Sequence, residues 1–159
     1  MAKNIFQDLT VLIVDDESMM RVLLKGLLHQ IGFEKILEAE DGGDALRRLE
    51  ESQQIDIVIC DLEMPLIGGL ELVGMLRGSK AVFNPNVPVI IVTGHSEQGN
   101  VHEAVRLGIH GFLVKPVSHT KLEAQIVRAL RRPTIKPASF AVKKRGVSDV
   151  EVLDFNKKK

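Results

Sequence analysis

The sequence predicts an α/β protein whose doubly wound, five-stranded parallel sheet carries helices on both faces. Two observations support this fold class. Five short apolar runs alternate along the chain with five stretches in which apolar residues recur at helical spacing. The runs are also apolar nearly throughout, as is typical of parallel strands that are buried on both faces. The 159 residues suffice for one core of this kind and an appendage.

The elements follow in regular order from the N-terminus. Residues 11–14 (Val-Leu-Ile-Val) predict the first strand, and residues 18–30 predict a helix because their leucines and methionines recur on one side. Residues 36–39 (Ile-Leu-Glu-Ala) predict the second strand. A second helix is expected around residues 45–49, where Ala, Leu and Leu have helical spacing.

The middle of the chain predicts one more strand, a helix and a further strand. Residues 57–60 (Ile-Val-Ile-Cys) predict the third strand, in which Cys60 is expected to be a small buried hydrophobe. A helix is expected near residues 70–76. Residues 78–88 contain Asn-Pro-Asn and predict a longer loop. The apolar run 89–92 predicts the fourth strand.

The last elements are a helix over about residues 97–107, a strand over 112–114 and a helix over roughly 118–131. Residues that commonly start or end helices agree with these positions. We expect Ser18 and Ser118 to be N-caps, and Gly32 and Gly108 to be left-handed C-caps.

Composition indicates an ordinary soluble protein, with 45% hydrophobic and 26% charged residues. The single cysteine excludes an internal disulfide and fits a reducing compartment. The N-terminus lacks a signal-peptide pattern, and no run reaches the roughly 18 apolar residues of a membrane span. Trp and Tyr are missing, so no aromatic platform for nucleic-acid bases is expected. These features predict a cytoplasmic protein that contacts neither membranes nor nucleic acids.

Charge is distributed unevenly along the chain. Residues 133–159 hold 7 of the 21 Lys and Arg but 3 of the 21 Asp and Glu, which leaves 14 basic and 18 acidic residues before them. We therefore expect a domain over residues 1–132 and a basic C-terminal tail or linker over 133–159. The tail also contains several apolar residues, so a solvated linker and docking on the acidic body or on a partner both remain open.

Polar residues of particular chemistry follow four of the five predicted strands. They are Asp15-Asp16 after the first, Asp61 after the third, Thr93 after the fourth and Lys115-Pro116 after the fifth. Individually they have ordinary explanations, such as acidic charge at a helix N-terminus or a solvated lysine. Parallel strands, however, bring their carboxyl ends to one edge of the sheet, where ligands of such folds bind. Together these residues predict a functional site at that edge.

The chemistry of this set favours a magnesium-dependent phosphoryl-transfer site. Carboxylates about 4 Å apart repel by roughly 4 kcal/mol per pair at an effective dielectric constant near 20, so their convergence calls for a cation. A few hard oxygen ligands favour Mg²⁺ over a transition metal. A carboxylate can accept a phosphoryl group, while a lysine and a hydroxyl stabilise the charge that is transferred.

From about Leu9 to Leu130 the chain resembles the CheY-type receiver family of response regulators. The matching segments are Val11–Glu17, Asp61–Pro65 with Gly68-Gly69, Val92–Gly94 and Gly111–Pro116. The resemblance implies a flavodoxin-like strand order 2-1-3-4-5, the order for which CheY is itself a reference example. It also implies that Asp61 is the phosphoacceptor and that the Lys115–Pro116 peptide bond is cis.

The resemblance assigns further roles residue by residue. Asp16 would bind the metal directly, Asp15 mainly through water, and the backbone carbonyl of Glu63 would be another ligand. Lys115 and Thr93 would contact the phosphoryl oxygens. Two more roles concern switching and lifetime. Thr93 and Phe112 would form the switch to the face of the fourth helix, fifth strand and fifth helix, and Glu63 and His95 would tune dephosphorylation. Phe112 stands where many members have Tyr.

The expected function is therefore that of a two-component receiver, phosphorylated by a cognate histidine kinase, that signals through a downstream protein. That target could be a flagellar motor component, as in chemotaxis, or another signalling protein. Apart from transfer to and hydrolysis from its own Asp61, no enzymatic activity is expected, and the protein would be a monomer or weak homodimer. Alternatives are the receiver part of a transcription factor or output enzyme, and a phosphate sink. A haloacid-dehalogenase-like hydrolase fits poorly because Glu63 stands where its second Asp would be.

Overall fold

A computed structural model describes residues 4–52, 54–94 and 98–131 of the chain, with side chains at 98–101 excepted. Its five strands form one parallel sheet in the order β2-β1-β3-β4-β5, which confirms the predicted fold and strand order. The strands are β1 (Thr10–Val14), β2 (Lys35–Ala39), β3 (Ile55–Asp61), β4 (Val89–Thr93) and β5 (Gly111–Val114). The helices are α1 (Ser18–Ile31), α2 (Gly42–Glu51), α3 (Gly69–Arg77), α4 (Gln98–Arg106) and α5 (His119–Arg131).

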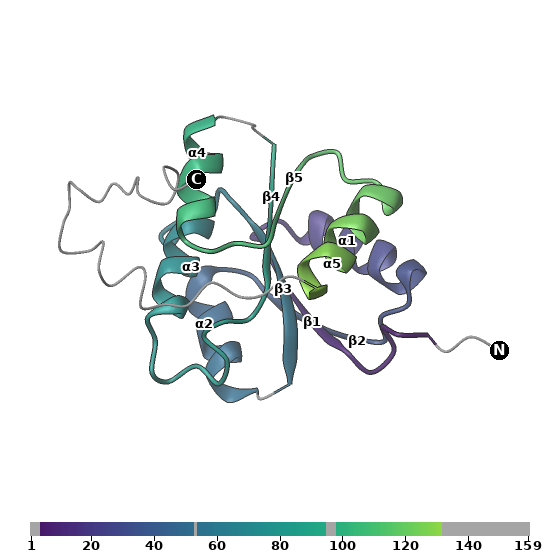
Figure 1. Ribbon diagram of the computed structural model, residues 1–159, viewed down its shortest axis with the longest axis horizontal. Helices are drawn as coiled ribbons and strands as arrows, with labels where there is room; N and C mark the ends of the chain where they lie inside the picture. Colours follow the sequence, from purple (N-terminus) through teal and green to yellow (C-terminus); the bar gives the residue numbers. More distant parts are fainter. Residues whose placement is uncertain (1–3, 53, 95–97, 132–159) are drawn as a thin grey trace.

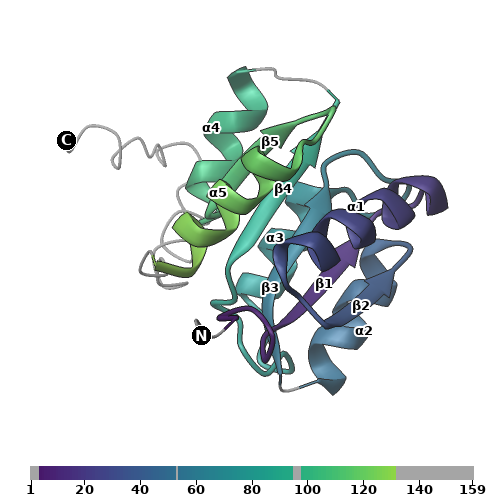
Figure 2. The same ribbon diagram turned by 90° about the vertical axis from the view of Figure 1, so that its right-hand side faces the viewer.

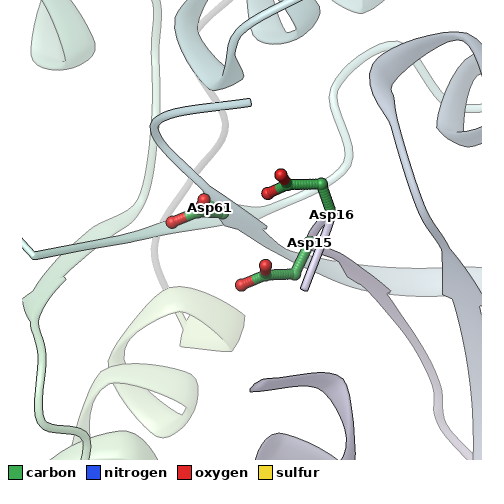
Figure 3. A group of neighbouring side chains, drawn as sticks. All are labelled: Asp15, Asp16 and Asp61. Atoms are coloured by element: carbon green, nitrogen blue, oxygen red, sulfur yellow. The ribbon is translucent and has the colours of Figure 1, made fainter. Parts of the chain in front are cut away.

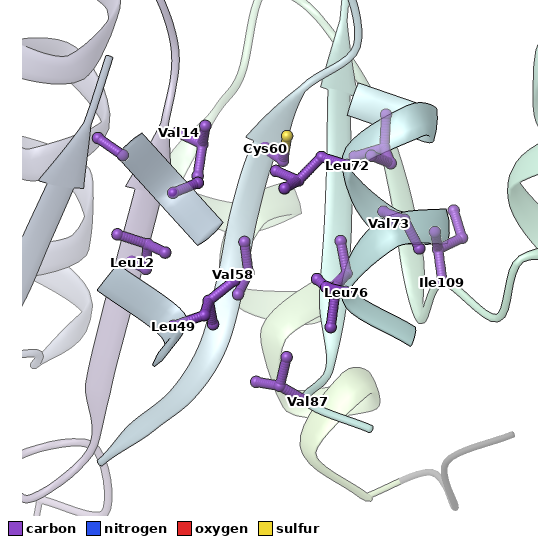
Figure 4. Packing of buried hydrophobic residues seen from close by; sticks show 14 of the residues in the cluster. Leu12, Val14, Leu49, Val58, Cys60, Leu72, Val73, Leu76, Val87 and Ile109 are labelled. Atoms are coloured by element: carbon purple, nitrogen blue, oxygen red, sulfur yellow. The ribbon is translucent and has the colours of Figure 1, made fainter. Parts of the chain in front are cut away.

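Helices cover both faces of the sheet, with α1 and α5 on one face and α2, α3 and α4 on the other (Figures 1 and 2). Successive side chains of a strand point to opposite faces, so each strand contributes to two cores. Val11 and Ile13 pack toward α1 and α5, whereas Leu12 and Val14 pack toward α2 and α3. Figure 4 shows the second of these cores. Burial on both faces explains why the central strands β1, β3 and β4 are mostly apolar, whereas the edge strand β2 is only partly buried and contains Glu38.

The ends of the elements agree with the predictions at some positions and differ at others. Strand β3 starts at Ile55, two residues earlier than predicted, and the Asp56 carboxylate accepts the Thr10 N–H at 2.8 Å. Ser118 is confirmed as an N-cap, because its hydroxyl accepts the Lys121 N–H at 3.2 Å. Gly32 and Gly108, at φ 132° and 81°, confirm the positive-φ residues predicted after α1 and α4.

The prediction that Ser18 is an N-cap is wrong. Helix α1 starts at Ser18, and Glu17 occupies the N-cap position without a side-chain bond to the helix. The reason lies upstream, because the carboxylate of Asp15 accepts the Glu17 N–H at 2.9 Å. An acidic side chain before the helix thus fixes the turn that leads into it.

Cys60 is fully buried in the core on the α2–α3 face, as predicted. Burial is the main cause that raises the pKa of its thiol well above the ordinary value, with the Asp61 and Asp15 charges adding to it. The thiol is therefore protonated and unreactive at neutral pH.

Arg77, the last residue of α3, is 2% exposed and has no carboxylate partner among the described residues. Its guanidinium instead donates to the carbonyls of Pro85, Val87 and Gly108 at 2.8–2.9 Å. Burial lowers its pKa to about 10, so the group stays charged at neutral pH. Arg77 therefore joins α3 to the loop before β4 and to the turn after α4.

Replacing Arg77 by Met is expected to lower the free energy of unfolding by about 3 kcal/mol, because three carbonyls lose a charged donor. Arg77→Lys should give an intermediate value, since an ammonium lacks the planar fork of a guanidinium. Urea unfolding followed by circular dichroism measures both. Arg128→Met, at an exposed position on α5, is the matched control. An Arg77→Met variant as stable as this control would contradict the prediction.

Candidate functional site

Three carboxylates meet at the carboxyl edge of the sheet. Asp15 and Asp16 follow β1, Asp61 ends the neighbouring strand β3, and each offers an oxygen within 4.8 Å of the others (Figure 3). Asp15 and Asp61 are buried, whereas Asp16 is exposed. The cluster is therefore fixed on its inner side and open to solvent on its outer side.

Lys115 supplies a positive charge to this cluster. Its Nζ lies 3.1 Å from Oδ1 of Asp61 and 3.9 Å from Oδ2 of Asp15. The backbone N–H of Lys115 donates to the Thr93 carbonyl at 2.7 Å, which continues the β4–β5 pairing past the end of β5. The Lys115–Pro116 peptide bond is cis, as the resemblance implies.

The backbone around Asp61 is held by two close contacts. The Leu62 N–H donates to the Val92 carbonyl at 3.0 Å, and the Gly69 N–H donates to the Leu62 carbonyl at 2.8 Å. Gly69 lies so close that a Cβ on it would collide with the Asp61 carbonyl oxygen. The sequence motif contains Gly68 and Gly69, the N-cap and the first residue of α3, but does not by itself indicate this role. A glycine at the start of a helix that follows a reactive strand end is the signal that could have suggested it.

Burial is the main cause that raises the pKa of Asp61 to about 6. Lys115 opposes this increase, whereas the negative charges of Asp15 and Asp16 add to it. Burial also raises the pKa of Asp15, opposed by the Glu17 N–H and by Lys115. For Lys115, burial alone would lower the pKa, but the Asp61 bond and the nearby carboxylates outweigh it and raise the pKa. The lysine is therefore charged at neutral pH, and the site holds excess negative charge.

This excess should destabilise the metal-free protein at neutral pH. Because the pKa of Asp61 is raised in the folded state, the folded state binds this proton more tightly than the unfolded chain does. Protonation of Asp61 therefore stabilises the fold at low pH, and this stabilisation is lost as the pH rises through about 6. Relative to Asp61→Asn, the wild type should lose on the order of 2 kcal/mol of unfolding free energy between pH of about 4 and about 7. Denaturant unfolding in EDTA across this range measures the difference. A constant difference would contradict the electrostatic account.

Of the other predicted site residues, Thr93 and Glu63 follow or end strands at the same edge, and Phe112 lies in the middle of β5. Thr93 is buried at the end of β4, whose residue Val92 pairs with Asp61. Glu63 is exposed two residues beyond Asp61, and Phe112 is half-buried against the core of the α2–α3 face. Leu66, in the loop between Asp61 and α3, is 95% exposed at φ 67°. His95 lies outside the described residues.

The donor set fits Mg²⁺. All three acidic groups offer hard oxygen ligands, and exposed Asp16 leaves room for water and a phosphoryl oxygen. Among the described residues no histidine or cysteine joins the cluster, so the nitrogen and sulfur ligands typical of zinc sites are missing there. The residues present therefore suit a magnesium site with exchangeable positions.

Comparison with known proteins agrees with this geometry. The protein-family model described as the response regulator receiver domain matches residues 11–127 of the chain. The chain therefore belongs to the response regulator receiver domain family, whose members are signalling proteins.

Individual relatives can be named as well. The chain is 34% identical to the chemotaxis protein CheY of Pseudomonas aeruginosa over 122 residues, which cover 77% of this chain and 96% of that protein. It is 32% identical to the chemotaxis protein CheY-3 of Vibrio cholerae over 126 residues, covering 79% and 95%. The structure of CheY4 from Vibrio cholerae matches with a TM-score of 0.69 at 28% identity, covering 77% of this chain and 98% of that one.

None of the described helices combines the length and apolar character required to cross a bilayer.

Proposed function

We propose that the protein is a phosphorylation switch in which Asp61 accepts a phosphoryl group from a histidine kinase in the presence of Mg²⁺. The observation that carries this proposal is the meeting of Asp15, Asp16 and Asp61 with the ammonium of Lys115 3.1 Å from Asp61. A nucleophilic carboxylate, flanking carboxylates for a cation and a fixed positive charge are the parts that phosphoryl transfer to an aspartate requires.

The transfer forms a bond between an Asp61 carboxylate oxygen and phosphorus while the bond from phosphorus to the donor nitrogen breaks. Bound Mg²⁺ would neutralise charge on the phosphoryl oxygens, held by Asp16 directly, by Asp15 mainly through water, and by the Glu63 carbonyl. Lys115, already aimed at the acceptor carboxylate, would move its ion pair to the phosphoryl oxygens. Hydrolysis of the acyl phosphate by water would return Asp61 to its starting state.

Phosphorylation would change the conformation of the surface formed by α4, β5 and α5. Thr93 would donate its hydroxyl to the phosphoryl group, and the half-buried ring of Phe112 would turn inward into the space that Thr93 leaves. The rearranged face would bind a downstream protein. The relatives named above are chemotaxis proteins, which favours a chemotaxis-type target. We place this switch in residues 1–132 of a cytoplasmic protein, with residues 133–159 as a basic tail or linker.

The proposal is tested with a small phosphodonor. After incubation with acetyl phosphate and Mg²⁺, the intact mass should increase by one phosphoryl group. EDTA should prevent the increase, and hydroxylamine should reverse it because it cleaves acyl phosphates. No increase at any Mg²⁺ concentration, or an adduct that resists hydroxylamine, would contradict phosphorylation on a carboxylate.

Glu63 and His95 are proposed to tune the lifetime of the phosphorylated state. Both positions should border the path of the attacking water, so replacing either by Ala should change the decay rate by more than a few-fold while phosphorylation persists. Decay is followed by intact mass after removal of the donor. Glu34→Ala, at an exposed position between α1 and β2, is the control. Decay rates equal to the control in both variants would reject the role.

A further inference from the structure

Arg21 connects the acidic cluster to strand β2, which contributes no side chain to it. One turn into α1, its side chain is 17% exposed. Its Nη1 donates to the backbone carbonyl of Asp15 at 2.7 Å, and its Nε donates to the Glu38 carboxylate at 3.0 Å. Glu38 lies in β2, one residue before Ala39. The guanidinium therefore bridges a charged group of β2 and the main chain of a predicted metal ligand.

The contact completes the bonding of Asp15. Its N–H donates to the Ala39 carbonyl at 3.2 Å, and its carboxylate accepts the Glu17 N–H at 2.9 Å. Arg21 binds the remaining backbone group, the carbonyl. Strand β2 thus holds Asp15 twice, directly through Ala39 and indirectly through Glu38 and Arg21.

Fixing this carbonyl also restricts the backbone from which the Asp16 side chain extends. The Asp15 carbonyl and the Asp16 nitrogen belong to one planar peptide unit, so the orientation of the first determines the orientation of the second. From that plane the Asp16 side chain points to the same side as that of Asp15, toward Asp61, with an oxygen within 4.8 Å of both (Figure 3). Without Arg21 the peptide between the two acidic residues could rotate away, because the repulsion between the carboxylates favours separation.

We propose that Arg21 is a positioning residue that holds the Asp15–Asp16 peptide in the orientation that binds Mg²⁺. The inference rests on the proposed function, since it concerns the same metal site. Mutation of groups that orient metal ligands without touching the metal commonly lowers metal affinity by about 10- to 100-fold. The Arg21 fork suits this role because its two donors engage Glu38 and Asp15 at the same time.

Lys25 separates this role from an ordinary ion pair between α1 and β2. Its Nζ lies 2.6 Å from the second carboxylate oxygen of Glu38, and no described hydrogen bond joins it to Asp15. Lys25→Met therefore removes one cation from Glu38 and leaves the Asp15 carbonyl bound. A purely structural ion-pair role predicts similar effects of Arg21→Met and Lys25→Met.

The test is calorimetric titration of Mg²⁺ into the wild type, Arg21→Met, Arg21→Lys and Lys25→Met, with thermal unfolding as a check on folding. Arg21→Met should raise the dissociation constant about tenfold or more, and Lys25→Met should leave it within about twofold of the wild type. Arg21→Lys, which can donate to the carbonyl but lacks the fork, should fall between them. At saturating Mg²⁺, the rate of phosphorylation by acetyl phosphate should recover in Arg21→Met.

Each contrary result has a separate meaning. Equal Mg²⁺ affinity in the wild type and Arg21→Met, or equal loss in Arg21→Met and Lys25→Met, would overturn the positioning role alone. A wild type that binds no Mg²⁺ would overturn the proposed function and this inference with it. Should Arg21→Met unfold at the assay temperature, Arg21→Lys against Lys25→Met makes the same comparison.

Discussion

Replacing Asp61 by Asn is expected to abolish the phosphoryl adduct completely. The amide has nearly the shape of the carboxylate but lacks its charge, and it is not a nucleophile that can form an acyl phosphate. The fold should persist, because the buried site already disfavours the charged form of the Asp61 carboxyl, whose pKa is raised to about 6, and the variant removes that charge. Intact mass after incubation with acetyl phosphate and Mg²⁺ measures the result.

Asp56→Asn is the matched control for this prediction. Asp56 lies in the same strand β3 but near its opposite end, and its carboxylate accepts the Thr10 N–H at 2.8 Å. An asparagine oxygen can accept the same bond, so this variant should be phosphorylated like the wild type. A full adduct in Asp61→Asn would show that another residue is the acceptor and would overturn the assignment.

Gly69→Ala and Gly26→Ala are expected to change stability in opposite directions. A Cβ on Gly69 would meet the Asp61 carbonyl oxygen and lie 3.0 Å from the Leu62 Cα, and both are backbone atoms that cannot turn aside. We expect a loss of about 3 kcal/mol and slower phosphorylation, because the backbone that carries Asp61 must shift. A Cβ on Gly26, in α1, would meet nothing within 4 Å. Gly26→Ala should therefore stabilise by about 0.5–1 kcal/mol through helix propensity.

Denaturant unfolding of the two variants tests the pair directly. Phosphorylation rates with acetyl phosphate provide a second measurement, in which Gly26→Ala should match the wild type. A Gly69→Ala variant as stable and as rapidly phosphorylated as Gly26→Ala would contradict the close approach of α3 to Asp61.

The fold could be predicted from the sequence because its central strands β1, β3 and β4 are buried on both faces and therefore appear as short apolar runs. Element ends were less predictable. The start of β3 includes polar Asp56, whose role depends on Thr10, distant in the sequence. Residue type predicts Ser18 as an N-cap, whereas the turn before α1 is fixed by Asp15. Local preferences could not indicate which of two neighbouring polar groups binds the backbone.

The site was predictable for a similar reason. Parallel topology brings strand ends together, so Asp15, Asp61 and Lys115 could be placed at one edge from their order alone. Arg21 and Arg77 could not be found this way, because an arginine in an amphipathic helix usually faces solvent. Their roles depend on backbone carbonyls, which every residue carries and which leave no trace in a single sequence.

The buried thiol of Cys60 has a practical consequence for spectroscopy. Because that sulfur is inaccessible and protonated, a maleimide dye would react almost entirely with a cysteine introduced at the surface. Leu66, 95% exposed in the loop between β3 and α3, offers a place for such a dye without loss of packing. Since the chain has neither Trp nor Tyr, a single label there would give an optical signal free of interference from native fluorophores.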